Sequence, residues 1–213
     1  MNTPPKLVIF DCDGVLVDSE PTANRVLHDI LTRQGATLTY AESCAEFTGK
    51  NRYAVIAYAE KHGITLPEKW YDEFYTTSIE LLREHCQPIP DVKSVLDTLT
   101  TARVPFCVAS NGVHPKMRAT LSTTGLLPYF EGKAYSGYDV EHGKPAPDLF
   151  LHASAQFNTD PTDCVVVEDS ATGLSAAAAA HMPAFAYDPS PQMELSGATA
   201  FKSMKELPKL LNL

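Results

Sequence analysis

Two acidic residues, Asp11 and Asp13, stand one residue apart in the stretch VIFDCDGVLVDSE. The preceding run Leu7–Phe10 is apolar and rich in strand-forming residues, which predicts a strand buried on both faces. Gly14 follows the acids, so a simple turn accounts for them about as well as a chemical site does. This segment alone leaves both interpretations open, and the rest of the chain has to decide between them.

Polar groups also follow other apolar runs. The runs at 104–109, 134–136 and 164–167 each lead to such groups, namely Ser110-Asn111-Gly112, Gly143-Lys144-Pro145 and Glu168-Asp169-Ser170. Ligands of open parallel α/β sheets bind just beyond the carboxyl ends of the strands. Turn chemistry alone does not explain a hydroxyl, a lysine and several acids at these ends. The sequence therefore predicts a binding or catalytic site there.

The elements that must position these groups alternate from residue 91 onward. Short apolar runs, too short for helices, are separated by helical stretches at 92–102, 115–124, 148–157 and 171–181, and a last strand is predicted at 184–187. Strands that alternate with helices of this length are typical of a parallel sheet covered by helices. We therefore expect an α/β fold built on a parallel sheet.

One interval breaks the alternation. From about residue 17 to residue 86 the patterns are helical, at 21–34 and 53–62, and a polar and aromatic segment follows at 68–85. We expect one domain made of residues 1–16 and 88–213 and a helical insertion at 17–87, with linkers at Gly14 and Gln87–Pro90.

Composition and charge narrow the class of protein. The 213 residues carry a net charge of −9, which disfavours nucleic acid and anionic membranes as partners. No apolar run approaches the ~20 residues of a membrane span, and we expect no signal peptide from MNTPPK. The five cysteines are scattered and form no C-x-x-C pair, as expected of reduced thiols in a cytoplasmic protein.

Four segments together resemble the motifs of the haloacid dehalogenase superfamily, in the same order and spacing. They are DCDGVLVDSE, SNG, GKPAPD and VVVEDSATG, and the resemblance covers residues 7 to about 188. By overall pattern the chain is most similar to sugar-phosphate phosphatases and β-phosphoglucomutase-like members. The resemblance implies a Rossmann-like parallel-sheet core with a small helical cap inserted after the first strand. It also implies a phosphatase that works through an aspartyl-phosphate.

The chemistry assigns expected roles to the motif residues. Asp11 would attack phosphorus, and Asp13 would protonate the leaving alcohol and later deprotonate water. Ser110 and the backbone N–H groups of Asn111 and Gly112 would surround the phosphoryl oxygens. Lys144 would stabilise the charge that spreads in the transition state, and we expect its bond to Pro145 to be cis.

A cation is expected because a carboxylate can attack an anionic phosphate ester only if the charge is neutralised. Mg²⁺ suits oxygen ligands and keeps several waters. We expect the carboxylates of Asp11 and Asp169 to bind it, and by resemblance the backbone carbonyl of Asp13. Glu168 would ligate it directly or orient its waters, and the sequence leaves these two roles open.

The substrate is expected to be a small phosphorylated metabolite, such as the acidic sugar phosphate 6-phosphogluconate. Its distal acid would meet Lys50 and Arg52 in the cap segment FTGKNR, and Glu20 would bind sugar hydroxyls. An interpretation without a ligand also stays open. In it, Lys50 and Arg52 simply mark the start of a surface helix, and Glu20 is an acid in the first turn of a helix, where the helix dipole favours it. We expect a monomer. One departure from the family is Asp91, which replaces the usual glycine after Ile89-Pro90.

Three alternative functions are less favoured by the sequence. A phosphomutase is less favoured because Ala23 stands where its pattern would place a histidine. A dehalogenase is less favoured because its halide leaving group needs no proton, whereas this chain has Asp13 as a candidate acid/base. A phospho-acceptor or binding protein is less favoured, because it would need only ~120 residues and a pair of adjacent acids. This chain instead has D-x-D-G and a 70-residue insertion.

Overall fold

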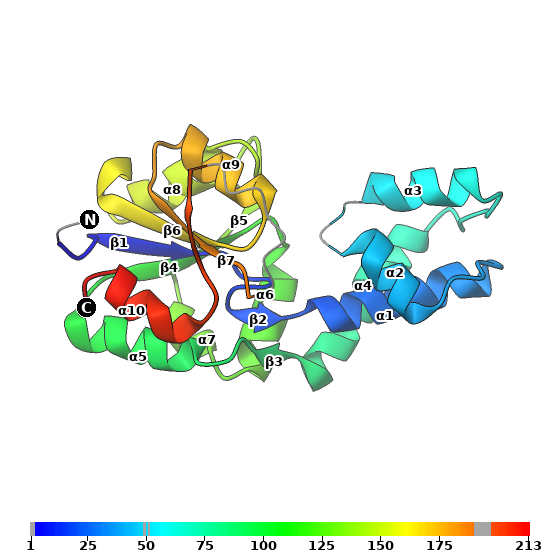
Figure 1. The fold of residues 1–213 in the computed structure, drawn as a ribbon, viewed down its shortest axis with the longest axis horizontal. Coiled ribbons are helices and arrows are strands. Elements are labelled where there is room, and N and C mark those ends of the chain that lie inside the picture. Colours follow the sequence, from blue (N-terminus) through cyan, green and yellow to red (C-terminus); the bar gives the residue numbers. More distant parts are fainter. Residues whose placement is uncertain (1–2, 49, 51, 190–196) are drawn as a thin grey trace. The chain divides into compact units, whose positions relative to one another are not determined.

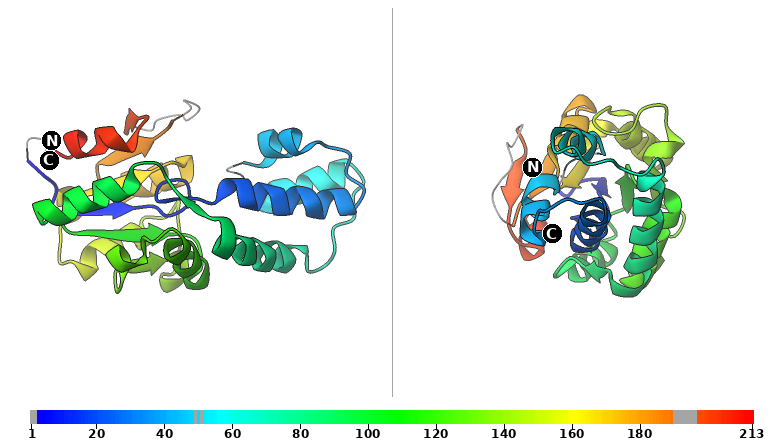
Figure 2. Two further views of the ribbon diagram at one scale, coloured as in Figure 1. Left: turned by 90° about the horizontal axis from the view of Figure 1, so that it is seen from below. Right: turned by 90° about the vertical axis from the view of Figure 1, so that its right-hand side faces the viewer.

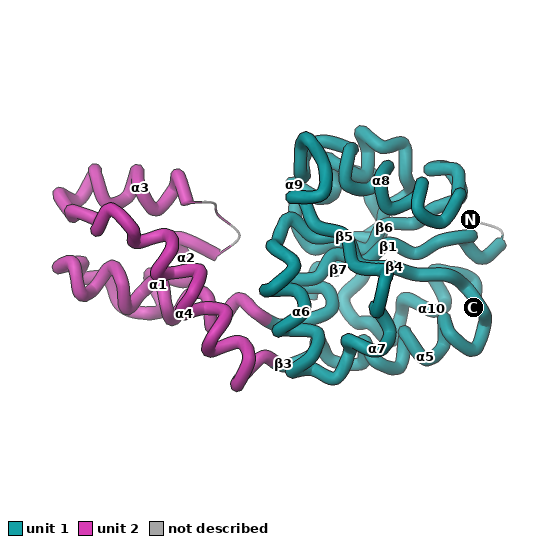
Figure 3. The backbone as a smooth tube through the Cα atoms, turned by 180° about the vertical axis from the view of Figure 1, so that it is seen from behind, with its two compact units in different colours: residues 1–18, 87–213 teal, residues 19–86 magenta. Residues whose placement is uncertain are grey.

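The chain forms two compact units in a computed structural model that describes residues 3–48, 50, 52–189 and 197–213. The larger unit comprises Met1–Asp18 and Gln87–Leu213, and the smaller one comprises Ser19–Cys86 (Figure 3). The smaller unit thus begins two residues later and ends one residue earlier than the insertion expected at 17–87. A role for it as a cap over the site is a proposal that we take up below.

A six-stranded parallel sheet forms the centre of the larger unit, in the order β5-β4-β1-β6-β7-β8. Its strands are β1 (Leu7–Phe10), β4 (Phe106–Ser110), β5 (Ala134–Ser136), β6 (Cys164–Glu168), β7 (Ala184–Tyr187) and β8 (Thr199–Phe201). The predicted α/β fold with a Rossmann-like parallel sheet is confirmed. The sequence did not predict β8.

Strand β1 lies in the middle of this sheet, where both of its faces are covered. All four of its residues are fully buried, which explains why the strand is apolar without alternation. Phe10 lies level with Val108 of β4 and with Val167 of β6. The Asp11 N–H continues the ladder by donating to the Val167 carbonyl at 2.9 Å. Asp11 is therefore held at the level where the neighbouring strands end.

Helices cover both faces of the sheet (Figures 1 and 2). They are α5 (Val92–Ala102), α6 (His114–Thr123), α7 (Leu127–Phe130), α8 (Asp148–Gln156), α9 (Ala171–Ala179) and α10 (Leu207–Leu210). Leu7 and Ile9 face a buried cluster that includes Phe150 of α8 and Ala176 of α9. Helices α5 and α10 pack against each other on the opposite face. Short 3-10 turns lie at Gly137–Asp139, Pro161–Asp163 and Met204–Glu206.

The smaller unit consists, in its described part, of helices α1 (Glu20–Arg33), α2 (Tyr40–Phe47), α3 (Arg52–Lys61) and α4 (Trp70–His85). Helix α1 buries Val26, Leu27, Ile30 and Leu31, which recur at the helical period and form one face. That face contributes to a core that also contains Trp70. The sequence did not predict α2, although Thr39 begins it with a capping box.

The two crossings between the units are paired with each other. Strand β2 (Val17–Asp18) and strand β3 (Gln87–Pro88) form a two-residue antiparallel ribbon. Asp91, which the family pattern would make a glycine, adopts a left-handed conformation with φ of 65° immediately before α5. Aspartate tolerates this conformation better than most side chains because its short carboxylate can bond locally.

Within the described residues, no helix is both long and apolar enough to cross a membrane. The five cysteines are free thiols. Cys44 is half-buried, and the other four (Cys12, Cys86, Cys107 and Cys164) are buried.

Candidate active site

Asp11 lies at the end of β1 in a buried position, with only 7% of its surface exposed. Its Oδ1 accepts a hydrogen bond from Lys144 Nζ at 2.5 Å. Burial raises the pKa of Asp11 to about 7, the Lys144 ammonium opposes that rise, and the carboxylates of Glu168 and Asp13 add to it. The position therefore concentrates negative charge and is suited to a positively charged ligand.

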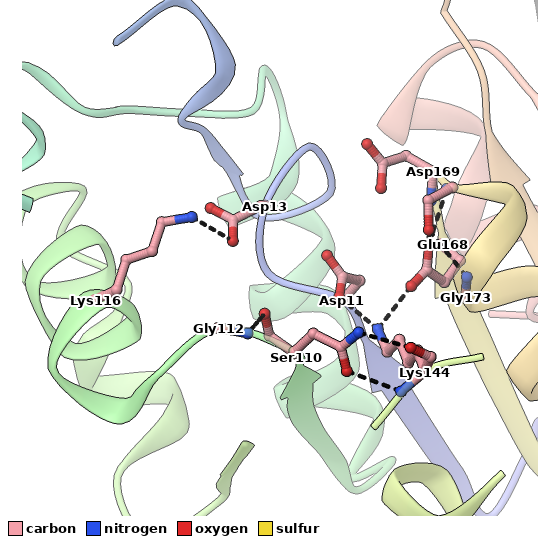
Figure 4. Close-up of polar contacts among 11 residues, drawn as sticks. Asp11, Asp13, Ser110, Gly112, Lys116, Lys144, Glu168, Asp169 and Gly173 are labelled. Atoms are coloured by element: carbon pink, nitrogen blue, oxygen red, sulfur yellow. Dashed lines mark hydrogen bonds and ion pairs between the residues drawn. The ribbon is translucent and has the colours of Figure 1, made fainter. Parts of the chain in front are cut away.

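Lys144 reaches the end of β1 from the loop between β5 and α8, and its bond to Pro145 is cis as expected. Its Nζ donates to Asp11 Oδ1 and also to Glu168 Oε1, at 2.6 Å. Burial alone would lower the pKa of this ammonium, but the two carboxylates outweigh burial and raise it. The ring of Phe150 lies 4.7 Å from Nζ. Lys144 is thus a fixed charge beside Asp11 (Figure 4).

Glu168 is almost fully enclosed, at 1% exposure, and protein groups bind both of its oxygens. Oε1 accepts from Lys144, whereas Oε2 accepts from the N–H groups of Asp169 and Ser170, both at 2.9 Å, and from the Ser170 hydroxyl at 2.8 Å. The carboxylate lies so close to Gly173 that a Cβ there would come within 1.8 Å of Oε1. These contacts anchor Glu168 at the N-terminus of α9 and let it position Lys144.

Asp13 points away from Asp11 and toward helix α6 (Figure 4). Its Oδ2 accepts a hydrogen bond from Lys116 Nζ at 2.8 Å. Sequence reasoning missed Lys116. A signal was available, because a lysine in the first turn of a helix is disfavoured by the helix dipole unless an acid is near. The two acids of D-x-D-G therefore face different surroundings, one buried with Lys144 and one half-exposed with Lys116.

Asp169 lies against the loop that follows Asp13. A Cβ placed on Gly14 would come within 1.8 Å of Asp169 Oδ2, and Gly14 has a φ of 81°. Only glycine allows both this backbone conformation and the close approach of the carboxylate. The sequence D-x-D-G thus needs its glycine to admit Asp169 beside the loop that carries Asp11 and Asp13.

Ser110 ends β4 and is buried, and its Oγ accepts from the Gly112 N–H at 3.0 Å. We expected this Gly112 N–H to bind the phosphoryl oxygens. In the structure it instead donates to the Ser110 side chain within the same turn. The Gly112 carbonyl in turn accepts from the Ser136 hydroxyl at 2.7 Å, a contact that sequence reasoning missed. The turn after β4 is fixed from both sides.

The Asn111 side chain binds the backbone of Lys144. Its Oδ1 accepts from the Lys144 N–H at 2.8 Å, and its Nδ2 donates to the Lys144 carbonyl at 3.0 Å. A Cβ on Gly137 or Gly143 would come within 2.8 or 2.6 Å of the same Oδ1. The two glycines therefore leave room for this amide.

The donor set fits a hard cation by its chemistry, since Asp11, Asp169 and the Asp13 carbonyl offer only oxygen atoms. Among the described residues, no group of three or more His, Cys, Asp or Glu side chains is gathered closely enough to hold a metal ion by itself. Mg²⁺ commonly takes only one or two carboxylates and fills its other positions with substrate and water. The charge around Asp11 is consistent with such a site.

The remaining expected residues belong to the smaller unit. Glu20 is the first residue of α1, Lys50 donates to Glu46 at 2.9 Å, and Gly49 and Asn51 of the segment FTGKNR lie outside the described residues. The Arg52 guanidinium lies over the rings of Tyr53 and Tyr71, 5.2 and 5.3 Å from their centroids. The roles expected for Glu20, Lys50 and Arg52 stay predictions.

Comparisons with known proteins identify the family of the chain. A family model described as haloacid dehalogenase-like hydrolase matches residues 5–181. The 6-phosphogluconate phosphatase of Escherichia coli (strain K12) is 32% identical over 208 residues, which cover 95% of this chain and 93% of that protein.

Two solved structures are also similar. A haloacid dehalogenase-like protein from Agrobacterium tumefaciens has a TM-score of 0.86 at 32% identity, with 97% of each chain covered. A HAD family hydrolase from Deinococcus radiodurans, with bound phosphate and sodium, has a TM-score of 0.83 at 30% identity and covers 99% of this chain and 96% of its own.

Proposed function

The chain belongs to the haloacid dehalogenase-like hydrolases and is a phosphatase of that family, and from this premise we propose that it is a Mg²⁺-dependent enzyme that hydrolyses an acidic sugar phosphate through an aspartyl-phosphate. The observation that carries the proposal is the arrangement of the two acids after β1. Asp11 is buried and bonded to Lys144, whereas Asp13 turns away to Lys116. One acid can therefore meet phosphorus while the other meets the leaving oxygen.

In the first step, an Asp11 carboxylate oxygen forms a bond to phosphorus as the ester P–O bond breaks. The leaving oxygen takes the proton of Asp13 and departs as an alcohol. In the second step, Asp13 removes a proton from water, whose oxygen bonds to phosphorus as the bond to Asp11 breaks. Inorganic phosphate leaves, and both carboxylates return to their starting forms.

Lys144 and Ser110 would stabilise the transferring phosphoryl group. The Lys144 ammonium is bonded to the nucleophile itself, so it can offset charge both on Asp11 and on the phosphoryl oxygens. The Ser110 hydroxyl already accepts from Gly112, which leaves its own proton to donate to a phosphoryl oxygen. Asn111 serves by fixing the Lys144 backbone.

The carboxylates of Asp11 and Asp169 and the carbonyl of Asp13 would hold Mg²⁺, which when bound would neutralise phosphoryl charge. The protein contacts of Glu168 support a positioning role, and its direct ligation of the metal stays a prediction.

The substrate class rests on charge and on likeness. A chain of net charge −9 must place its cations where an anionic ligand has its charges. The similarity to a 6-phosphogluconate phosphatase supports an acidic sugar phosphate. In this proposal the smaller unit acts as a cap that contributes Glu20, Lys50 and Arg52. A monomeric state and a cytoplasmic location, with which the five free thiols agree, stay predictions.

Phosphate release from a panel of phosphorylated metabolites, with Mg²⁺ and with EDTA, tests the proposal. We expect Mg²⁺-dependent turnover, a preference for acidic sugar phosphates, and no turnover by Asp11→Asn. Turnover that is unchanged by EDTA would contradict the metal requirement, and an inactive parent enzyme would contradict the function itself.

A further inference from the structure

Lys116 contacts Asp13, but the proposed reaction steps assign it no role. It lies in the first turn of α6, and its ammonium is 2.8 Å from Asp13 Oδ2. The two side chains are partly open, with exposed fractions of 19% for Lys116 and 28% for Asp13. Both residues belong to the larger unit, so their contact does not depend on where the smaller unit lies.

The position of Lys116 relative to the reacting groups follows from Gly112. A Cβ built on Gly112 would lie 3.3 Å from Ser110 Oγ, 3.8 Å from Asp13 Oδ2 and 3.9 Å from Lys116 Cδ. The lysine stem therefore runs beside both the phosphoryl-binding turn and the acid/base. Figure 4 shows the Lys116 side chain extended toward Asp13. Since Asp13 must touch the ester oxygen in the proposed reaction, the first atoms of the leaving group would come within reach of the flexible lysine arm.

Other cations near or expected at the site have different surroundings. Lys144 is enclosed by Asp11 and Glu168, and at 4% side-chain exposure it cannot turn toward a leaving group. Lys50 pairs with Glu46, and Arg52 lies over two tyrosine rings. Lys116 combines a partly exposed side chain with a contact to Asp13, the proposed acid/base.

A lysine at this point of a helix also needs a reason. Position 116 is the third residue of α6, where the positive end of the helix dipole disfavours a cation. The contact with Asp13 offsets this penalty. An anionic group on a bound substrate would offset it equally well.

We propose that Lys116 determines specificity by binding a carboxylate on the leaving group, exchanging its contact with Asp13 for one with the substrate. This inference rests on the proposed function. It adds that the core unit itself, and not only the cap, recognises the acidic tail. The exchange also frees Asp13 Oδ2 to face the ester oxygen.

A matched pair of substrates tests this assignment. 6-Phosphogluconate and sorbitol 6-phosphate have the same open chain and differ only in carrying a carboxylate or a hydroxymethyl group. We expect the parent enzyme to favour the acid in kcat/KM by at least ~10-fold, and Lys116→Met to reduce that ratio by ~10-fold or more, on the scale of one charge-assisted hydrogen bond. Lys116→Arg, which keeps the charge, should restore part of the ratio.

Lys6→Met is the control. Lys6 directly precedes the N-terminal end of β1, the end away from Asp11, and its Nζ pairs with Asp163 Oδ2 at 2.8 Å. It removes the same charge and should leave the ratio unchanged. Should Lys116→Met fold poorly by circular dichroism, Lys116→Gln serves in its place.

Equal losses on both substrates would overturn the inference, because Lys116 would then act only through Asp13. A parent enzyme without preference for the acid would overturn it as well. Failure of the proposed function looks different, since the parent would then hydrolyse neither of these substrates nor p-nitrophenyl phosphate.

Discussion

Asn111 and Lys144 are joined by two hydrogen bonds in which one side-chain amide pairs with one backbone residue. The Lys144 N–H donates to Asn111 Oδ1 at 2.8 Å, and Asn111 Nδ2 donates to the Lys144 carbonyl at 3.0 Å. The pair connects the end of β4 to a loop 33 residues further along the chain. It fixes the backbone from which the Lys144 ammonium reaches Asp11.

Removal of this connection should reduce the rate more than the affinity. In Asn111→Ala the Lys144 loop loses both bonds, so we expect kcat to fall by ~10-fold or more while KM changes little, since misplacement of a catalytic charge acts on the transition state. The free energy of unfolding should fall by ~1–3 kcal/mol. Steady-state kinetics and urea unfolding measure the two effects.

Asn111→Asp provides the comparison, because it keeps an oxygen that accepts from the Lys144 N–H but turns a carboxylate oxygen toward the Lys144 carbonyl in place of the donor. Its kcat should therefore fall at least as far as that of Asn111→Ala. An Asn111→Ala enzyme with the parent's kcat would show that the connection has no catalytic consequence.

The proposed nucleophile is tested by Asp11→Asn. An amide does not attack phosphorus, so turnover should be lost while the fold remains. Phosphate release and far-UV circular dichroism report the two properties. Activity within tenfold of the parent under Mg²⁺ would refute the aspartyl-phosphate mechanism.

Asp13→Asn separates the side chain of Asp13 from its backbone carbonyl. The carbonyl remains, so Mg²⁺ binding measured by calorimetry should persist, whereas turnover should fall by ~10²–10⁴ through loss of the acid/base. Asp169→Ala is the matched variant that removes an expected carboxylate ligand. If both variants weaken Mg²⁺ binding equally, the Asp13 side chain and not its carbonyl is the ligand.

The raised pKa of Asp11 has a consequence for stability in the absence of divalent cations. The folded state holds the Asp11 proton up to about pH 7, above the ordinary value of 3.8, so its contribution to stability is present below pH ~4 and is lost as pH rises through ~7. Asp11→Asn cannot ionise at this position. In EDTA we therefore expect this variant to gain stability relative to the parent between pH 5 and pH 8, by on the order of a few kcal/mol.

Urea unfolding at several pH values measures this difference. Added Mg²⁺ should stabilise the parent at pH 8 and have much less effect on Asp11→Asn, which lacks one carboxylate ligand. A difference that does not change with pH would show that Asp11 titrates as an ordinary carboxyl.

Arg52 tests the proposed role of the cap. Arg52→Ala should raise KM for 6-phosphogluconate and leave p-nitrophenyl phosphate nearly unaffected, because remote binding energy helps only a ligand that reaches it. Arg25→Ala is a matched control in the same unit, since Arg25 lies over the Tyr40 ring at 4.0 Å. Equal losses on both substrates would instead assign Arg52 to the packing of the smaller unit with Tyr53 and Tyr71.

The sequence predicted those strands that burial makes apolar along their whole length. Strand β1 and the first four residues of β6 are continuous apolar runs because both faces of these strands are covered, and such runs stand out in a sequence. Strand β8 was missed because two of its three residues are exposed, so it forms no buried apolar run. Strand β5, the three-residue strand at the other edge of the sheet, was predicted, and its residues are buried or half-buried.

The site divides in a similar way. The nearness of the polar residues at the strand ends was predictable, because a parallel sheet brings those ends together, as it does for Asp11, Ser110 and Glu168. Their roles in the reaction stay predictions. The contact of Asp13 with Lys116 was not predictable, because no local pattern specifies the path of the helix that carries Lys116. The same holds for the contact of Asn111 with Lys144, which lies in a loop. Contacts between side chains distant in sequence depend on the folded backbone.

The short ribbon of β2 and β3 makes the position after Asp18 a permissive insertion point. Val17 pairs with Pro88 and Asp18 with Gln87, so the chain leaves the larger unit and returns to it at neighbouring residues. The free-energy cost of closing that gap depends only weakly on the length of the inserted segment, because the entropy of closing a loop grows slowly with its length. A helical segment of different size or sequence can therefore replace Ser19–Cys86 without altering the path of the sheet.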